Sequence, residues 1–224
     1  LPSSFRIVRQ LLDRIEDSAS GEVLVRAANV EIPGYRLDEA AVAAASFPAL
    51  STSFRPLPGV RSMRADATDE LVAETWRPAL EVIGVDGLPP VADAGNVFRS
   101  RLAVKLSLRV PPTADVWAVG DELKSLLEAD PPYGAKVALR DGARGPGWAA
   151  PEFAPWLARA TADASLQHFG APVASCGVGG TIPFMGMLGE PFPDAQFLLV
   201  GVLGPGSNAH GPDEFLDLPT ARRV

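Results

Sequence analysis

The chain has 224 residues, 20 Lys and Arg against 27 Asp and Glu, a net charge of −7 at pH 7 and 47% hydrophobic residues. This composition excludes a disordered chain, and the negative charge argues against binding to nucleic acid or to acidic lipid. No apolar run reaches the roughly 18 residues that span a bilayer. The single cysteine, Cys176, excludes an internal disulfide, so we expect a small buried thiol in a reducing, cytoplasmic compartment. Because Leu1 is not an initiator methionine, we expect the chain to begin within a longer protein.

The first elements expected along the chain are mostly helical. Apolar residues recur at helical spacing from Phe5 to Ile15, behind Ser3 or Ser4 as a possible N-cap. The further elements expected before residue 90 are a helix over 38–46, a loop over 51–62, a helix over 70–76 and a strand over 80–85.

The clearest pattern in the chain is the strict alternation over 101–110, which predicts a strand with one apolar face and one basic face. Pro111 and Pro112 end this strand, and Thr113 is expected to cap a helix that runs to Ala129. A further alternating run over 135–140 predicts another strand. The order of helix, strand, strand, helix and strand matches a split β-α-β-β-α-β pattern that lacks its first strand.

Glycine and proline are concentrated over 141–151, where we place a domain boundary. Beyond it we expect a helix over 152–169. The apolar run FLLVGVL over 197–203 then predicts a strand buried on both faces. A polar loop, GPGSNAHGPDEF, follows this strand. Since sites in open α/β sheets gather at the carboxyl ends of strands, this loop is the first candidate for chemistry.

The individual residues leave alternatives open. His210 in the polar loop is either a metal ligand or general base, or an ordinary loop histidine, and the latter is the more common case. His168 is expected to cap the end of its helix. The turn from Gly177 to Thr181 either cradles an anion or simply reverses the chain. Arg109 either binds a carboxylate or belongs to a solvated basic face.

Several longer stretches resemble the C-terminal part of the M20 family of dinuclear-zinc metallopeptidases, and most of all its carnosinase-like dipeptidases. The stretches are GVGGTIPFMGMLGE (177–190), QFLLVGVLGPGSNAHGPDEFL (196–216) and NVFRSRLAVKLSLRVPP (96–112). This resemblance implies an α/β catalytic domain with an inserted α+β lid, or dimerisation domain, of ferredoxin-like β-α-β-β-α-β layout. Residues 1–143 would then form the lid without its first strand, and 144–224 the C-terminal portion of the catalytic domain.

The resemblance also implies roles for four residues. His210 corresponds to the family's last zinc ligand, and Arg109 to the lid arginine that grips the substrate carboxylate. Asn96 corresponds to a polar lid residue that approaches the substrate from the partner subunit, and Thr181 to a residue that helps to hold the same carboxylate. A homodimer formed through the lid, two zinc ions per protomer of the complete protein, and dipeptide or N-acyl amino acid substrates follow from the same resemblance.

The chain departs from the family in two ways. Val178 stands where the family often has a glutamate. The family's H-x-D motif, its Glu-Glu pair with the general base, a further carboxylate ligand and a lid histidine have no counterpart in the sequence. We therefore expect a fragment of a zinc hydrolase that contains no catalytic residue and does not bind zinc tightly on its own. The alternative is a non-catalytic module that dimerises and binds ligands.

Overall fold

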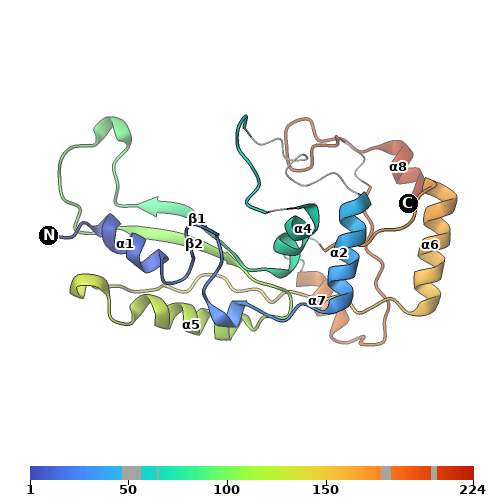
Figure 1. The fold of residues 1–224 in the computed structure, drawn as a ribbon, viewed down its shortest axis with the longest axis horizontal. Coiled ribbons are helices and arrows are strands. Elements are labelled where there is room, and N and C mark those ends of the chain that lie inside the picture. The colour runs from blue at the N-terminus through green and yellow to red at the C-terminus, as the bar shows by residue number, and fades with distance from the viewer. Residues whose placement is uncertain (47–56, 65, 178–182, 203–205) are drawn as a thin grey trace. The chain divides into compact units, whose positions relative to one another are not determined.

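The computed structural model describes residues 1–46, 57–64, 66–177, 183–202 and 206–224 (Figure 1). These residues form two compact units, which are described separately. Unit 1 comprises Leu1–Ala149 and Ser175–Met187, and unit 2 comprises Ala150–Ala174 and Leu188–Val224. The domain limits given by the resemblance, 1–143 and 144–224, stay a prediction. Within the described residues, no helix has the length and apolar character needed to cross a membrane.

Unit 1 begins with the predicted amphipathic helix, α1 (Ser4–Leu12), which is capped by Ser3. The hydroxyl of Ser3 accepts a hydrogen bond from the N–H of Arg6 at 3.2 Å. The chain then passes through a short 3-10 turn, η1 (Arg26–Ala28), before α2 (Gly34–Ser46) and α4 (Ala67–Trp76). Both later helices were predicted, with shorter limits, from the sequence.

The strands predicted over 80–85 and 101–110 form an antiparallel hairpin in unit 1. They are β1 (Ala79–Asp86) and β2 (Ala103–Arg109) (Figure 1). Ala79 lies opposite Arg109 at one end, and Asp86 lies opposite Ala103 at the other. The connecting loop contains the short turn η2 (Val91–Asp93). Leu106 and Leu108 pack against the core of unit 1 while Lys105 and Arg109 are exposed, so the predicted basic face is confirmed.

Helix α5 (Val116–Glu128) follows β2, but Thr113 is not its cap. Asp115 takes that role, because its carboxylate accepts hydrogen bonds from the N–H groups of Trp117 and Ala118 at 2.9 and 3.3 Å. The helix buries its apolar side in the main core of unit 1. The buried members of this core are Leu11, Ile15, Val23, Val25, Ala28, Leu80, Ala114, Val119 and Leu127.

The strand predicted over 135–140, after the turn η3 (Pro132–Gly134), is wrong. Val137 and Leu139 do pack against the core, as the alternation requires. The N–H of Leu139, however, donates to Oε1 of Glu128 at 2.7 Å instead of to a neighbouring strand. The described part of the chain contains a two-stranded sheet, and the ferredoxin-like layout stays a prediction.

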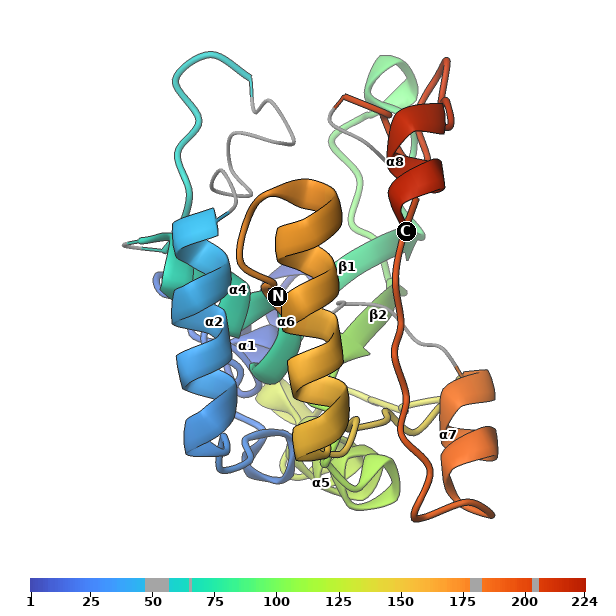
Figure 2. The same ribbon diagram turned by 90° about the vertical axis from the view of Figure 1, so that its right-hand side faces the viewer.

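Unit 2 is built around α6 (Pro155–Phe169), which ends at Gly170 with a φ of +70°. His168 lies in the last turn of this helix, where it was predicted. Helix α7 (Pro183–Gly189) crosses the boundary between the units, and α8 (Leu218–Arg223) closes the chain. Figure 2 shows the chain from α7 up to residue 202 without a helix or strand.

The strand predicted over 197–203 is also wrong in its described part, 197–202, where no strand is present. Leu198, Leu199 and Val200 are 51, 50 and 63% exposed instead of buried. A strand buried on both faces needs neighbouring strands, and the described residues of unit 2 contain none. The start of this stretch is tied to α6, because the N–H of Ala154 donates to Oε1 of Gln196 at 2.6 Å.

Candidate functional site

The first candidate group is Arg109 of unit 1. It is the last residue of β2 and is exposed, because the alternation of the strand directs Leu106 and Leu108 to the core. A guanidinium in this position has the geometry to bind a carboxylate through two parallel N–H···O hydrogen bonds. The end of β2 therefore presents a group suited to an anionic ligand.

Glu74 lies near Arg109 at the end of α4. Desolvation raises the pKa of Glu74, and the positive charge of Arg109 acts against this shift. The register of the hairpin explains the proximity, because β1 starts at Ala79, shortly after α4, and Ala79 pairs with Arg109. The two side chains are therefore electrostatically coupled. Sequence reasoning missed Glu74, since no local pattern connects an exposed helical glutamate to the end of a later strand.

The stretch Ser175–Gly177 belongs to unit 1 again and lies beside the end of α4. A Cβ atom on Gly177 would lie 2.7 Å from Cγ2 of Thr75, so this close approach to α4 requires glycine. Desolvation and the negative charge of Glu74 raise the pKa of the Cys176 thiol. Cys176 is nevertheless exposed, so its expected burial is wrong. The glycine-rich turn, for which an anion cradle and a simple chain reversal were both left open, starts at Gly177, while Thr181 lies outside the described residues.

Asn96 lies at the other end of the hairpin from Arg109. It is exposed in the loop between β1 and β2, which connects Asp86 to Ala103. The six steps along β2 from Ala103 to Arg109 correspond to about 20 Å. The structure therefore does not bring Asn96 and Arg109 of one chain together.

His210 lies in the predicted polar loop, which belongs to unit 2. The loop is closed by a hydrogen bond from the N–H of Phe215 to the carbonyl of Ser207 at 3.1 Å. The N–H of His210 donates to Oε2 of Glu214 at 3.2 Å. Asn208, His210 and Asp213 have φ values of 55, 60 and 58°. Such left-handed non-glycine residues are uncommon and cluster at functional sites.

The described residues do not form a metal centre on their own. A zinc site takes about four ligands, of which at least three come from the protein in catalytic sites. Within the described residues, no group of three or more His, Cys, Asp or Glu side chains could hold a metal ion. His210 is exposed and could supply one ligand.

No family model matches the chain. Among curated proteins, the cysteinylglycine-S-conjugate dipeptidase of Corynebacterium striatum is 33% identical over 174 residues, which are 73% of this chain and 36% of that protein. This similarity agrees with the resemblance found in the sequence.

Three solved structures share the fold. Human carnosine dipeptidase 1 has a TM-score of 0.65 at 23% identity, over 85% of this chain and 41% of that one. A di-peptidase from Saccharomyces cerevisiae has a TM-score of 0.67 at 19% identity, over 98% and 46%. An M20 family metallo-carboxypeptidase from Sulfolobus solfataricus has a TM-score of 0.71 at 16% identity, over 100% and 50%. The chain thus spans half or less of the length of each protein it matches.

Proposed function

Since the chain has a dipeptidase-like M20 fold over the length it covers, we propose that it is part of a dinuclear zinc peptidase that hydrolyses dipeptides or N-acyl amino acids in the cytoplasm. The proteins it resembles are hydrolases of this family. The observation that carries the proposal is the meeting of Arg109, the end of α4 and the stretch that leads into Gly177–Thr181. Both proposed substrate classes end in a carboxylate, which is the group this arrangement would bind.

Arg109 is the residue that grips this carboxylate. Its guanidinium would form two charge-assisted hydrogen bonds, and Thr181 would add a hydroxyl or backbone donor from the glycine-rich turn. Glu74 is coupled to Arg109 and would act as a positioning residue that orients the guanidinium. The contribution of these residues is to bind and orient the substrate rather than to transfer protons.

His210 would supply one metal ligand from the polar loop of unit 2. The described residues do not complete a metal site. We therefore assign the general base and the other ligands to polypeptide that is not part of this chain. This chain would then contribute one metal ligand and the residues that bind the substrate carboxylate, Arg109 and Thr181, which we call the carboxylate grip. It would contribute none of the groups that move protons.

The exposed stretch over 197–202 supports the need for further polypeptide. Leu198, Leu199 and Val200 are at least half exposed in a sequence that has the composition of a buried strand. Complete burial of such a side chain is worth about 1.5–3 kcal/mol relative to exposure. Added strands beside this stretch would recover part of that free energy, and the matched proteins are at least twice as long as the region they share with this chain.

A homodimer through the lid is part of the proposal, because it gives Asn96 a role. Asn96 is exposed and stands at the opposite end of the hairpin from Arg109 of its own chain. It could therefore serve the substrate site of a second subunit more easily than its own. This arrangement is the one the family resemblance implies.

The second candidate is a non-catalytic module that dimerises and binds carboxylate ligands. It is favoured by the lack of a metal-binding group among the described residues. The two candidates differ in whether zinc and catalysis appear when the chain is part of a complete protein.

The test compares this chain with the complete protein that contains it. Zinc content is measured by plasma mass spectrometry, and hydrolysis is measured with a free-acid dipeptide. We expect about two zinc ions per protomer and turnover in the complete protein, and neither in this chain alone. A complete protein without bound zinc and without turnover would favour the module. Zinc-dependent turnover by this chain, absent from His210→Ala, would refute the assignment of the base to other polypeptide.

A further inference from the structure

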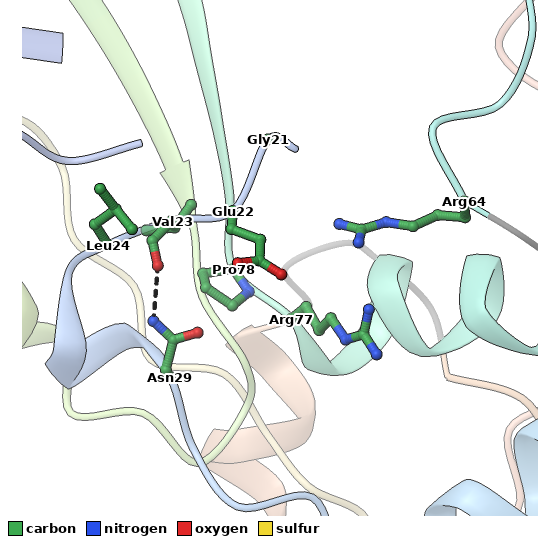
Figure 3. A pocket seen from close by; sticks show the side chains of 8 residues that line it. All are labelled: Gly21, Glu22, Val23, Leu24, Asn29, Arg64, Arg77 and Pro78. Atoms are coloured by element: carbon green, nitrogen blue, oxygen red, sulfur yellow. Dashed lines mark hydrogen bonds between the residues drawn. The ribbon is translucent and has the colours of Figure 1, made fainter. Parts of the chain in front are cut away.

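Unit 1 has a hollow that is distinct from the carboxylate-gripping residues. It has a volume of about 560 Å³ and is lined by Gly21, Glu22, Val23, Leu24, Asn29, Arg64, Arg77 and Pro78 (Figure 3). This volume lies within the range of small-molecule sites, about 300–1,000 Å³. None of the residues singled out from the sequence lines this pocket.

The pocket carries groups of both charges on facing walls. Figure 3 shows the carboxylate of Glu22 and the guanidinium of Arg64 pointing toward one another across the opening. Arg77 lies below Arg64 in this view, with its guanidinium on the same side of the pocket, and it pairs with Asp69, with Nη1 to Oδ1 at 2.8 Å. Because a guanidinium has five N–H donors, this pair leaves Arg77 further donors.

The other walls are held in place by backbone contacts. Nδ2 of Asn29 donates to the carbonyls of Val23 and Val25 at 2.9 and 3.0 Å, so its Oδ1 is the group left to accept from a ligand. Gly21 has a φ of +71°, and a Cβ there would overlap Cε of Met63. This close approach brings the segment that contains Arg64 against the turn that contains Glu22.

We propose that this pocket binds a free α-amino acid, with its carboxylate on Arg64 and Arg77 and its ammonium group on Glu22 and Oδ1 of Asn29. A simple anion would meet the negative charge of Glu22, and a simple amine would meet two guanidinium groups. A zwitterion of short length satisfies both walls at once, because each of its charges faces the opposite charge. Pro78 offers apolar surface to an aliphatic side chain.

The proposal is tested by calorimetric titration of the full 224-residue chain with L-leucine, N-acetyl-L-leucine and L-leucinamide. The acetylated compound lacks the ammonium group, and the amide lacks the carboxylate. We expect saturable binding of leucine, and binding of each analogue that is about tenfold weaker or more, as the loss of a charge-assisted hydrogen bond implies.

Two variants test which wall of the pocket binds the ammonium group of the ligand and which binds its carboxylate. In Glu22→Gln, leucine should lose its advantage over N-acetyl-leucine, and in Arg64→Gln it should lose its advantage over leucinamide. The matched controls are Glu31→Gln and Arg61→Gln, which change the same residue types outside the lining and should leave all three affinities unchanged. Arg109→Gln removes the carboxylate grip, at which leucine and N-acetyl-leucine could also bind, so the leucine binding that remains in this variant is that of the pocket. Circular dichroism checks that each variant is folded.

Four results would overturn the proposal. The first is no saturable binding of leucine up to about 10 mM, as expected if Arg64 and Glu22 simply pair with each other. The second is equal binding of leucine and N-acetyl-leucine by the wild-type chain, which would indicate an anion site. The third is unchanged discrimination in both lining variants, and the fourth is loss of binding in Arg109→Gln, since both would place the ligand elsewhere.

Discussion

Glu122 on α5 fastens the turn η1 to the core of unit 1. Its carboxylate accepts hydrogen bonds from the N–H groups of Ala27 and Arg26 at 2.7 and 3.2 Å. Nε of Arg26 also donates to it at 3.3 Å, but that side chain is 94% exposed and adds little stability. We therefore base the prediction on the two backbone bonds.

The perturbation is Glu122→Gln, which keeps the shape but removes the charge. Hydrogen bonds to a charged group contribute about 1.5–3 kcal/mol, against about 1 kcal/mol for a neutral pair. The amide oxygen of glutamine can accept one of the two backbone bonds, so we expect a loss of about 1–2 kcal/mol in the free energy of unfolding. Urea unfolding at pH 7, followed by circular dichroism, measures the loss. The matched control is Asp121→Asn at the adjacent, exposed position of α5, which should change the free energy by less than about 0.5 kcal/mol.

The pH dependence gives a second, independent measure of the same contact. The hydrogen bond from the N–H of Ala27 is the main reason why the pKa of Glu122 lies below its ordinary value of 4.5. A lowered pKa in the folded state means that the stabilisation is complete above the unfolded value and is lost as the pH falls through the folded value. The wild-type chain and Glu122→Gln should therefore converge in stability in acid. An equal gap at neutral and at strongly acidic pH would refute the reasoning.

Three further predictions concern single contacts. Glu74→Gln should lower the pKa of the Cys176 thiol and speed its alkylation by iodoacetamide near pH 8, whereas Asp121→Asn should not; equal rates would contradict the coupling. His210→Ala in the complete protein should remove about one of the two zinc ions per protomer that we propose for it, and an unchanged zinc content would make His210 an ordinary loop residue. Leu127→Ala should destabilise unit 1 by about 2–5 kcal/mol, because Leu127 is 7% exposed, and similar losses from Leu127→Ala and the exposed Leu166→Ala would contradict this packing.

Local patterns predicted the elements whose limits are set locally. Helix α1 follows a serine cap, and β2 is a regular alternation that ends before Pro111 and Pro112. Each of these signals acts within a few residues. The shift of the α5 cap from Thr113 to Asp115 has the same local origin, since both residues are suitable caps and the carboxylate lies nearer to the orphan N–H groups.

The wrong predictions share a different origin. The runs over 135–140 and 197–202 have the composition of strands. A strand is defined by hydrogen bonds to a partner strand, however, and the sequence of a run does not specify that partner. Glu74 was missed for the same reason, because its importance comes from Arg109, a residue of a later element. The specific roles of the candidate site residues came from a family resemblance, and the structure adds neighbours such as Glu74 beside Arg109.

The carboxylate grip itself is tested by Arg109→Ala in the complete protein. Arg109 stands on the exposed face at the end of β2, where its guanidinium can reach a ligand while Leu106 and Leu108 stay in the core. Removing a charge-assisted pair should cost about 1.5–3 kcal/mol, which is roughly a tenfold to hundredfold loss in kcat/KM. The loss should fall on KM, and zinc content should stay normal.

Amidated dipeptides show whether Arg109 binds the substrate carboxylate directly or only contributes to the positive charge of the strand face. They lack the terminal carboxylate, so Arg109→Ala should change their kcat/KM little, while free-acid dipeptides should show the full loss. Lys105→Ala is the matched control, because Lys105 is exposed on the same face of β2 but is not at its end. If free acids and amides lost activity equally, or if Lys105→Ala had the same effect, Arg109 would belong only to a solvated basic face. Selective loss with free acids requires direct contact between Arg109 and the carboxylate, since a distant charge would be screened by salt.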